Sequence, residues 1–290
     1  MIRYWTPPAS SFNFLRHGLL ALLLAVFSVP FTTSAAGAAE RARVEAFLNI
    51  TGFDVALDSI ALSAGDAPQM LGVKPDVFGA DWTRLTQDVF DTKVMRTIAL
   101  DILEETLSDQ ALGHAAAFYA SDLGQRLVVA ENASHMANDD AQKQQEGTRL
   151  VAELVANGSP RLELFKRMNQ AINGAETGLR ALQEIQVRFL LAASAAGVID
   201  LKMDADQLRR YLKSQEGTMR RAIQMSALSG SAYTYRSFSD ADVEAYVEAL
   251  EEPDMVQVYE LLNAVQYEIM ANRFEVLAGR MADLHPGQDI

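Results

Sequence analysis

The chain has 290 residues, a formal net charge of −13 at pH 7 and no cysteine. The absence of cysteine excludes disulfides, thiolate zinc sites, a lipidated cysteine and a cysteine nucleophile. The acidic charge disfavours contact with phosphate backbones and anionic lipid, so the sequence predicts no nucleic-acid partner and no membrane partner after processing.

Residues 1–38 are typical of a secretory signal peptide. Arg3 and Arg16 form a basic leader, an apolar run occupies residues 18–29, and small residues follow. Either Ala36 or Ala38 satisfies the small-x-small rule for cleavage. Twelve helical residues rise only about 18 Å, against roughly 30 Å of membrane hydrocarbon. We therefore expect cleavage, which removes two arginines and no acid and changes the net charge from −13 to −15.

The remaining sequence is predicted to be helical throughout. Apolar residues recur at spacings of three and four, and alternating β-branched runs are almost absent. Residues 157–160 (NGSP) combine a helix stop with a proline restart. We predict an all-α fold, a helical bundle made of two tandem hairpin repeats, residues 39–158 and residues 159–290.

Matching landmarks support the predicted duplication. Arg43 returns as Arg161 after 118 residues, and Ser108 returns as Ser239 after 131 residues. The difference of 13 residues indicates that the second repeat has gained a segment, which we place around residues 187–204. This segment contains a run of small residues that suits close helix packing inside the body of the protein.

Each repeat is predicted to contain two helices joined by a tight corner. Ser108 and Ser239 each precede a predicted helix. At such a position the serine hydroxyl can accept a hydrogen bond from a free amide group in the first turn of the helix. Asp122 corresponds to Pro253, and proline is favoured at the first position of a helix. Ser121 is therefore predicted to be an N-cap.

An apolar stripe at helical spacing follows each of the two capping serines. Its members are Leu112, Ala115, Ala116 and Tyr119 in the first repeat, and Val243, Tyr246, Val247 and Leu250 in the second. The large side chain moves from Tyr119 in one stripe to Tyr246 in the other. We interpret this exchange to mean that each stripe keeps its total packing volume, although the large residue occupies a different position.

Residues 107–109 (LSD) and 118–127 (FYASDLGQRL) resemble the signature of a proteobacterial family. That family is exported and helical, and is classed as a domain of unknown function. The family usually has proline at the position of Asp122. The second copy, residues 238–263, keeps this proline but lacks the glycine and the aromatic pair, and is therefore degenerate. The resemblance implies a helical fold and a periplasmic location, without an assigned substrate.

If the first repeat is the intact copy, its motif supplies the binding candidates. They are Phe118, Tyr119, Ser121, Gly124 and Gln125. Gly124 also occupies the position where a side chain would collide with the preceding helix.

No constellation predicts a catalytic site, a metal site or a cofactor. The chain lacks a G-x-S-x-G motif, and His114, His135 and His285 have no second ligand at helical spacing. Residues 200–206 faintly resemble a calcium loop but lack its glycine. Asp204 is more simply the cap of the following helix.

The sequence therefore predicts a non-catalytic binding or assembly module with a small-molecule or protein partner. One alternative is a hydrolase near the first motif that uses Tyr119, Ser121 and His114. Another is a holdase-like chaperone with methionine-rich grooves. Methionine is also ordinary core filler, which is the interpretation that we favour.

Overall fold

The computed structural model describes residues 33–70, 79–137 and 139–281, and within these ranges it contains helices and no strand. The predicted all-α helical bundle is confirmed. Most of the predicted signal peptide, residues 1–32, lies outside the described residues. Both predicted cleavage positions, Ala36 and Ala38, fall within α1 (Thr33–Thr51).

The helices follow one another with short connections. The first half of the chain contains α1, α2 (Phe53–Ser59), a 3₁₀ helix (Ile60–Asp66), α3 (Ala67–Met70), α4 (Gly79–Val89), α5 (Thr92–Thr106), α6 (Asp109–Tyr119), α7 (Asp122–His135) and α8 (Asp140–Ala156). The second half contains α9 (Arg161–Ala171), α10 (Gly174–Ala195), α11 (Ala205–Ser214), α12 (Glu216–Thr234), α13 (Asp240–Glu251) and α14 (Pro253–Met281).

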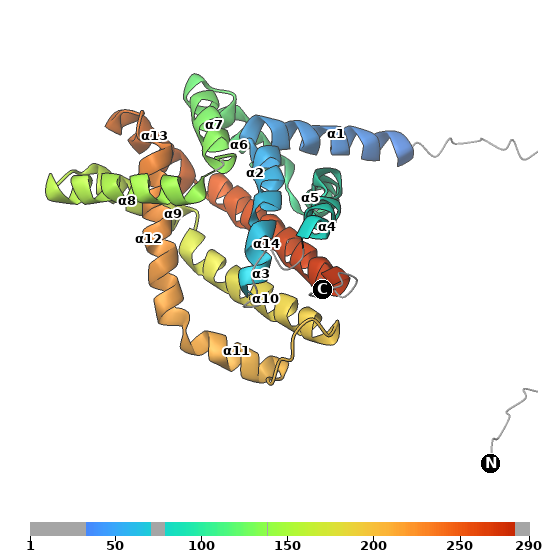
Figure 1. Cartoon of the computed structure of the whole chain (residues 1–290). Coiled ribbons are helices and arrows are strands. Elements are labelled where there is room, and N and C mark those ends of the chain that lie inside the picture. The colour runs from blue at the N-terminus through green and yellow to red at the C-terminus, as the bar shows by residue number, and fades with distance from the viewer. Residues whose placement is uncertain (1–32, 71–78, 138, 282–290) are drawn as a thin grey trace, which may run out of the picture.

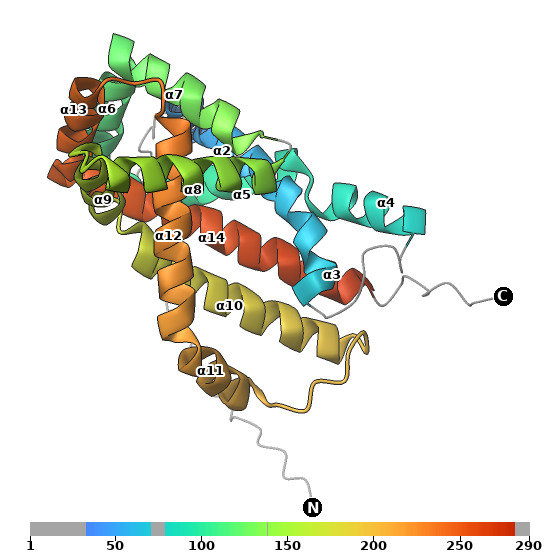
Figure 2. The same ribbon diagram turned by 60° about the vertical axis from the view of Figure 1, so that its left-hand side comes forward.

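The long helix α14 is the central element of the bundle. It lies along α10 and also packs against α4, α5 and α6 of the first half (Figures 1 and 2). Its buried residues recur every three or four positions, and they include Val258, Leu262, Val265 and Ile269. Further buried residues, including Ala271 and Ala278, lie outside this stripe, so α14 is apolar on more than one side and helices from both halves share one core around it.

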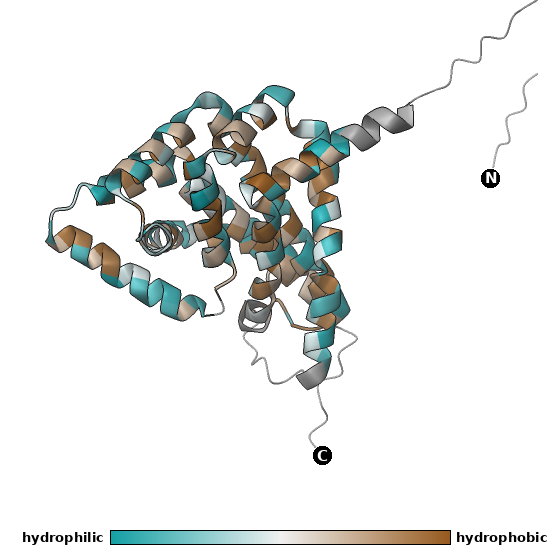
Figure 3. Cartoon of the chain, turned by 90° about the horizontal axis from the view of Figure 1, so that it is seen from above, coloured by the Kyte–Doolittle hydropathy of each residue, from teal (hydrophilic) through white to brown (hydrophobic). Residues whose placement is uncertain are grey.

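Hydrophobic residues gather on the facing sides of the helices, whereas polar residues cover the outer faces (Figure 3). One large cluster of buried residues extends through α1 to α14. A small second cluster, Val187, Leu208 and Leu212, holds α11 against α10. The helix α11 is therefore attached to the body by few apolar side chains.

The predicted caps are confirmed. Ser108 Oγ accepts a hydrogen bond from Ala111 N at 3.2 Å, and Ser239 Oγ accepts one from Asp242 N at 3.1 Å. Pro253 is the first residue of α14. These contacts satisfy amide groups that the first turn of each helix leaves without an internal partner.

Corresponding arginines pair with corresponding aspartates at the two hairpins. Arg43 lies 2.8 Å from Asp109, and Arg161 lies 2.5 Å from Asp240. Likewise, α1 packs on α6 as α9 packs on α13. This agreement supports the predicted duplication into residues 39–158 and 159–290, which stays a prediction.

The expectation for the small residues near the end of α10 was wrong in part. Ala193 is buried, but Ala195 and Gly197 are exposed. Gly197 has φ +74°, and the amide of Val198 donates to Ala193 O at 2.9 Å, which ends the helix. These residues form a helix terminus of the type that favours glycine rather than a packing surface.

Among the described residues, no single helix combines the length and apolar character needed to cross a membrane. One pair bent by 77°, Glu40–Thr51 with Phe53–Gly65, meets these criteria by length and composition alone.

Candidate functional site

The corner between α6 and α7 has the predicted close geometry. Ser121 Oγ accepts from Gly124 N at 3.1 Å and donates to Phe118 O at 2.6 Å. A Cβ atom on Gly124 would lie 2.4 Å from Phe118 O and 2.6 Å from Tyr119 Cα. Gln125 is exposed, and its Nε2 donates to Ala120 O at 3.1 Å. Ser121, Gly124 and Gln125 therefore shape the corner.

The other two motif residues point into the protein. Phe118 is half-buried, and its ring stacks on that of Tyr246 with 5.8 Å between centroids and 8° between planes. Tyr119 is buried and meets the Phe118 ring edge-on at 5.2 Å. The motif thus joins α6 to α13 of the second half.

Four tyrosine hydroxyls and one carboxylate meet behind this corner. Tyr246 hydroxyl lies 3.1 Å from that of Tyr119 and 2.8 Å from that of Tyr259, and Tyr119 also contacts Tyr259. Glu131 Oε1 accepts from Tyr235 at 2.7 Å and from Tyr246 at 2.9 Å. These five residues, which we call the tyrosine–glutamate cluster, come from α6, α7, α13, α14 and the end of α12.

Burial raises the pKa of the Glu131 carboxyl to about 7, although the hydrogen bonds from Tyr235 and Tyr246 act in the opposite direction. Burial also raises the pKa of the four tyrosines, so their hydroxyls stay protonated at neutral pH. No ion pair joins Glu131 to a cation in the described part of the chain. Glu131 therefore titrates near neutral pH.

The cluster lines a cavity of about 300 Å³ between the two halves, which we call the inner cavity. Its size is at the lower end of the range of small-molecule pockets, roughly 300–1,000 Å³. Glu131 is only half-buried, because part of its side chain faces this space. Apolar side chains, including Met168 and Leu262, line other parts of the wall.

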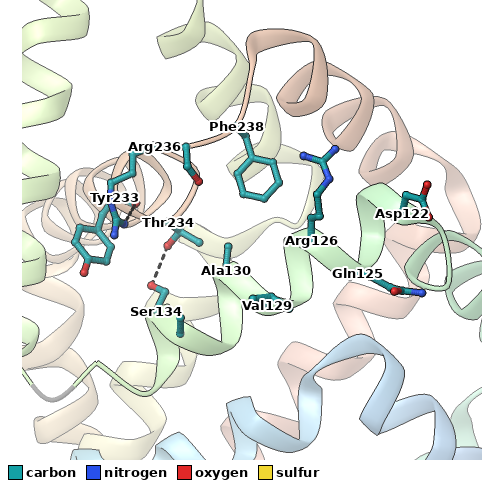
Figure 4. A pocket seen from close by; sticks show the side chains of 12 residues that line it. Asp122, Gln125, Arg126, Val129, Ala130, Ser134, Tyr233, Thr234, Arg236 and Phe238 are labelled. Atoms are coloured by element: carbon teal, nitrogen blue, oxygen red, sulfur yellow. Dashed lines mark hydrogen bonds between the residues drawn. The ribbon is translucent and has the colours of Figure 1, made fainter.

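A wider groove of about 980 Å³ lies outside the inner cavity. Figure 4 shows this outer groove between α7 and residues 233–238. Ser134 and Thr234 line both spaces, and their hydroxyls are 2.8 Å apart. This hydrogen bond therefore lies between the inner cavity and the outer groove. Gln125 is among the residues that line the outer groove.

The residues named in the hydrolase alternative do not form a hydrogen-bonded catalytic arrangement in the described structure. The hydroxyl of Ser121 is engaged as a helix cap, and in the described residues no hydrogen bond joins it to His114. Asp204 is a cap as predicted, because its carboxylate accepts from Gln207 N at 2.8 Å. Within the described ranges, no group of three histidine, aspartate or glutamate side chains could hold a metal ion.

Sequence reasoning identified Tyr119 but missed Glu131, Tyr235 and Tyr259. Tyr246 was interpreted only as core packing, although its hydroxyl meets that of Tyr119. The large residue of each apolar stripe is a tyrosine, and a buried tyrosine hydroxyl usually has a hydrogen-bond partner. This property could have indicated a polar contact at Tyr119 and Tyr246. Nothing in the local pattern distinguishes Glu131 from the other acidic residues.

Residues 93–153 match a family described as "Uncharacterized protein conserved in bacteria (DUF2059)". The matched segment extends from α5 into α8 and includes the five motif candidates and Glu131. No curated protein and no solved structure matches the chain. Over residues 93–153 the chain is therefore similar to a bacterial family of unknown function.

Proposed function

We propose that this chain is an exported protein that binds a small molecule in the inner cavity without transforming it. The observation that carries the proposal is a carboxyl group, Glu131, held by tyrosine hydroxyls at the wall of a cavity. Perturbed carboxyl groups in cavities of this kind concentrate at functional sites.

A purely structural role for the cluster gives a weaker account. A buried carboxyl without a cation is costly, and a core that needed only stability would be better served by apolar side chains. The cavity also leaves space next to the carboxyl that a packing role does not require. Both features are expected where a ligand completes the site.

The chaperone alternative has less support. Met168, Met255 and Met281 are buried, with exposed fractions of 3% or less, whereas Met225 is 51% exposed. The buried methionines fill the core, and the favoured interpretation as filler accounts for them.

Thermal unfolding of the purified chain with a panel of small amines, neutral hydroxyl compounds and carboxylates tests the proposal. A ligand at a hundred times its dissociation constant adds about 2.7 kcal/mol, which raises Tm by roughly 5–10 °C at this size. Glu131→Gln should lose most of the shift, whereas Glu105→Gln, an exposed change on α5, should keep it. A panel that leaves Tm unchanged, or that stabilises Glu131→Gln equally, would contradict binding at this site.

Export is the second part of the proposal, and residues 1–38 support it. The full chain should appear in the periplasmic fraction of a Gram-negative host. Its intact mass should correspond to cleavage after Ala36 or Ala38. Cytoplasmic retention at full mass would argue against export while leaving the binding proposal intact.

A further inference from the structure

Several hydrogen-bond donors around the inner cavity are already engaged with the protein. Asn263 Nδ2 donates to Ile172 O at 3.2 Å, and Asn169 Nδ2 donates to Ser231 Oγ at 3.4 Å. Ser231 Oγ in turn donates to a backbone carbonyl at 2.9 Å. Each of these groups has committed one proton, although the Nδ2 atoms of Asn169 and Asn263 each keep a second proton.

The tyrosine hydroxyls are engaged as well. The cluster has four hydroxyl protons, of which two are donated to Glu131 Oε1 and the others serve contacts among Tyr119, Tyr246 and Tyr259. There are three contacts among these three hydroxyls, more than the remaining two protons can fill. A ligand that needed a proton from these hydroxyls would have to break this network.

Acceptors, in contrast, remain available in the same wall. Both hydrogen bonds to Glu131 end on Oε1, so Oε2 has no partner within the described residues. The side-chain oxygens of Asn169 and Asn263 are likewise without a donor there, since only their Nδ2 atoms are engaged. Asn132 Oδ1 is also without a partner in the described residues, but it is buried against Gly52 and is therefore not accessible to a ligand.

The one ammonium group in the wall does not reverse this balance. Lys143 Nζ donates to Ser134 O at 3.0 Å and lies 3.4 Å from the Asp140 carboxylate. Its charge is thus partly neutralised at the junction of α7 and α8. Glu131, in contrast, has no ion-pair partner among the described residues, so its carboxylate contributes an unpaired negative charge to the cavity wall.

We propose that the inner cavity accepts a small primary amine, bound as an ammonium ion by the free oxygens of Glu131, Asn169 and Asn263. This assignment rests on the proposed binding function and adds the chemical class of the ligand. An ammonium group has three donors and no acceptor, which complements a wall rich in free acceptors. The apolar part of the ligand would lie against Met168 and Leu262, which line the same cavity.

Three probes of similar size and different headgroup test the assignment: benzylamine, benzyl alcohol and benzoate. Calorimetric titration of the wild-type chain at pH 8 should give benzylamine at least about 10-fold tighter binding than benzyl alcohol, and no binding of benzoate. Glu131→Gln should weaken benzylamine by about 10-fold or more and leave benzyl alcohol unchanged. The control Glu105→Gln should retain the wild-type order.

The outcomes separate the two proposals. Benzyl alcohol or benzoate binding as tightly as benzylamine would overturn the amine assignment and leave binding at the cavity standing. Failure of all three probes, together with a flat thermal panel, would overturn both. The order of the wild-type affinities is informative even if Glu131→Gln does not fold.

Discussion

Glu131 is a carboxyl group in the core whose partners are neutral hydroxyls. Burial raises its pKa from 4.5 to about 7, so the native state holds a proton that the unfolded state has released between these values. The free energy of unfolding therefore falls as pH rises through this window, by roughly 3 kcal/mol in total. Below about pH 4.5 the full contribution of Glu131 protonation to the free energy of unfolding is present, and above about pH 7 this contribution has been lost.

This linkage gives a prediction for Glu131→Gln, which keeps the hydrogen-bonding shape and removes the titration. Between pH 5 and pH 7.5 the wild type should lose roughly 2 kcal/mol more stability than the variant, because that interval covers most of the window. Urea unfolding of both proteins at the two pH values measures the difference. Parallel pH dependences would mean that Glu131 is solvated and ionised throughout.

The glycine at the α6–α7 corner supports a second prediction. Gly124→Ala should destabilise by about 1–3 kcal/mol, because its Cβ would meet the backbone at Phe118 O and Tyr119 Cα. Gly113→Ala in α6 is the matched control, since nothing lies within 4 Å of its Cβ position. The control should stabilise by about 0.5–1 kcal/mol. Equal melting points for the two variants would remove the tight-corner argument.

At this scale the sequence was a good guide to local chemistry. Ser108, Ser121 and Ser239 were placed as caps because a cap depends on residues a few positions away. The role of Tyr119 could not be found in this way, because the hydroxyls that it meets lie 127 and 140 positions along the chain.

The corresponding arginines of the two hairpins, Arg43 and Arg161, differ in burial and in their hydrogen-bond partners. Arg161 is 13% exposed at its side chain and donates to Tyr235 O at 2.6 Å and Phe238 O at 2.8 Å, in addition to its pair with Asp240. Arg43 is 48% exposed and pairs with two exposed carboxylates, Asp109 at 2.8 Å and Glu40 at 3.1 Å. Arg161 thus satisfies carbonyl groups at the end of α12, whereas Arg43 forms surface ion pairs.

The pair of arginines gives an element-scale prediction. Arg161→Ala should destabilise by about 2–4 kcal/mol, because it leaves two carbonyl groups at the α12–α13 connection without their charged donor. Arg43→Ala should cost clearly less than Arg161→Ala, because solvent screens ion pairs as exposed as those of Arg43. Urea unfolding of the two variants under the same conditions tests the contrast. Similar losses would show that the hairpins depend equally on their arginines.

The two halves of the chain depend on each other. Tyr119 and Glu131 from the first half bond to tyrosines from the second, and α8 crosses α12 so closely that a Cβ on Gly147 would lie 2.2 Å from Ser229 O. In addition, α14 packs against α5 and α6. The core is therefore shared rather than divided between the predicted repeats.

This sharing predicts that neither residues 39–158 nor residues 159–290 fold alone. Each fragment would expose the apolar faces that the other covers, at a cost of about 25 cal/mol per Å². Circular dichroism of each fragment in urea should show no cooperative transition, and equimolar mixing should restore one. A cooperative transition in the second fragment alone would identify it as an independent domain.

The sequence by itself determined the helical class, the capping serines, the tight corner and the break near residue 158, because each depends on neighbours within a few turns. The motif residues include Tyr119, and their part in binding stays a prediction. Only the tertiary structure decided that Tyr119, Tyr235, Tyr246 and Tyr259 converge on Glu131 beside a cavity. Their meeting depends on how five helices cross, and helix crossing is set by the packing of whole faces rather than by local pattern.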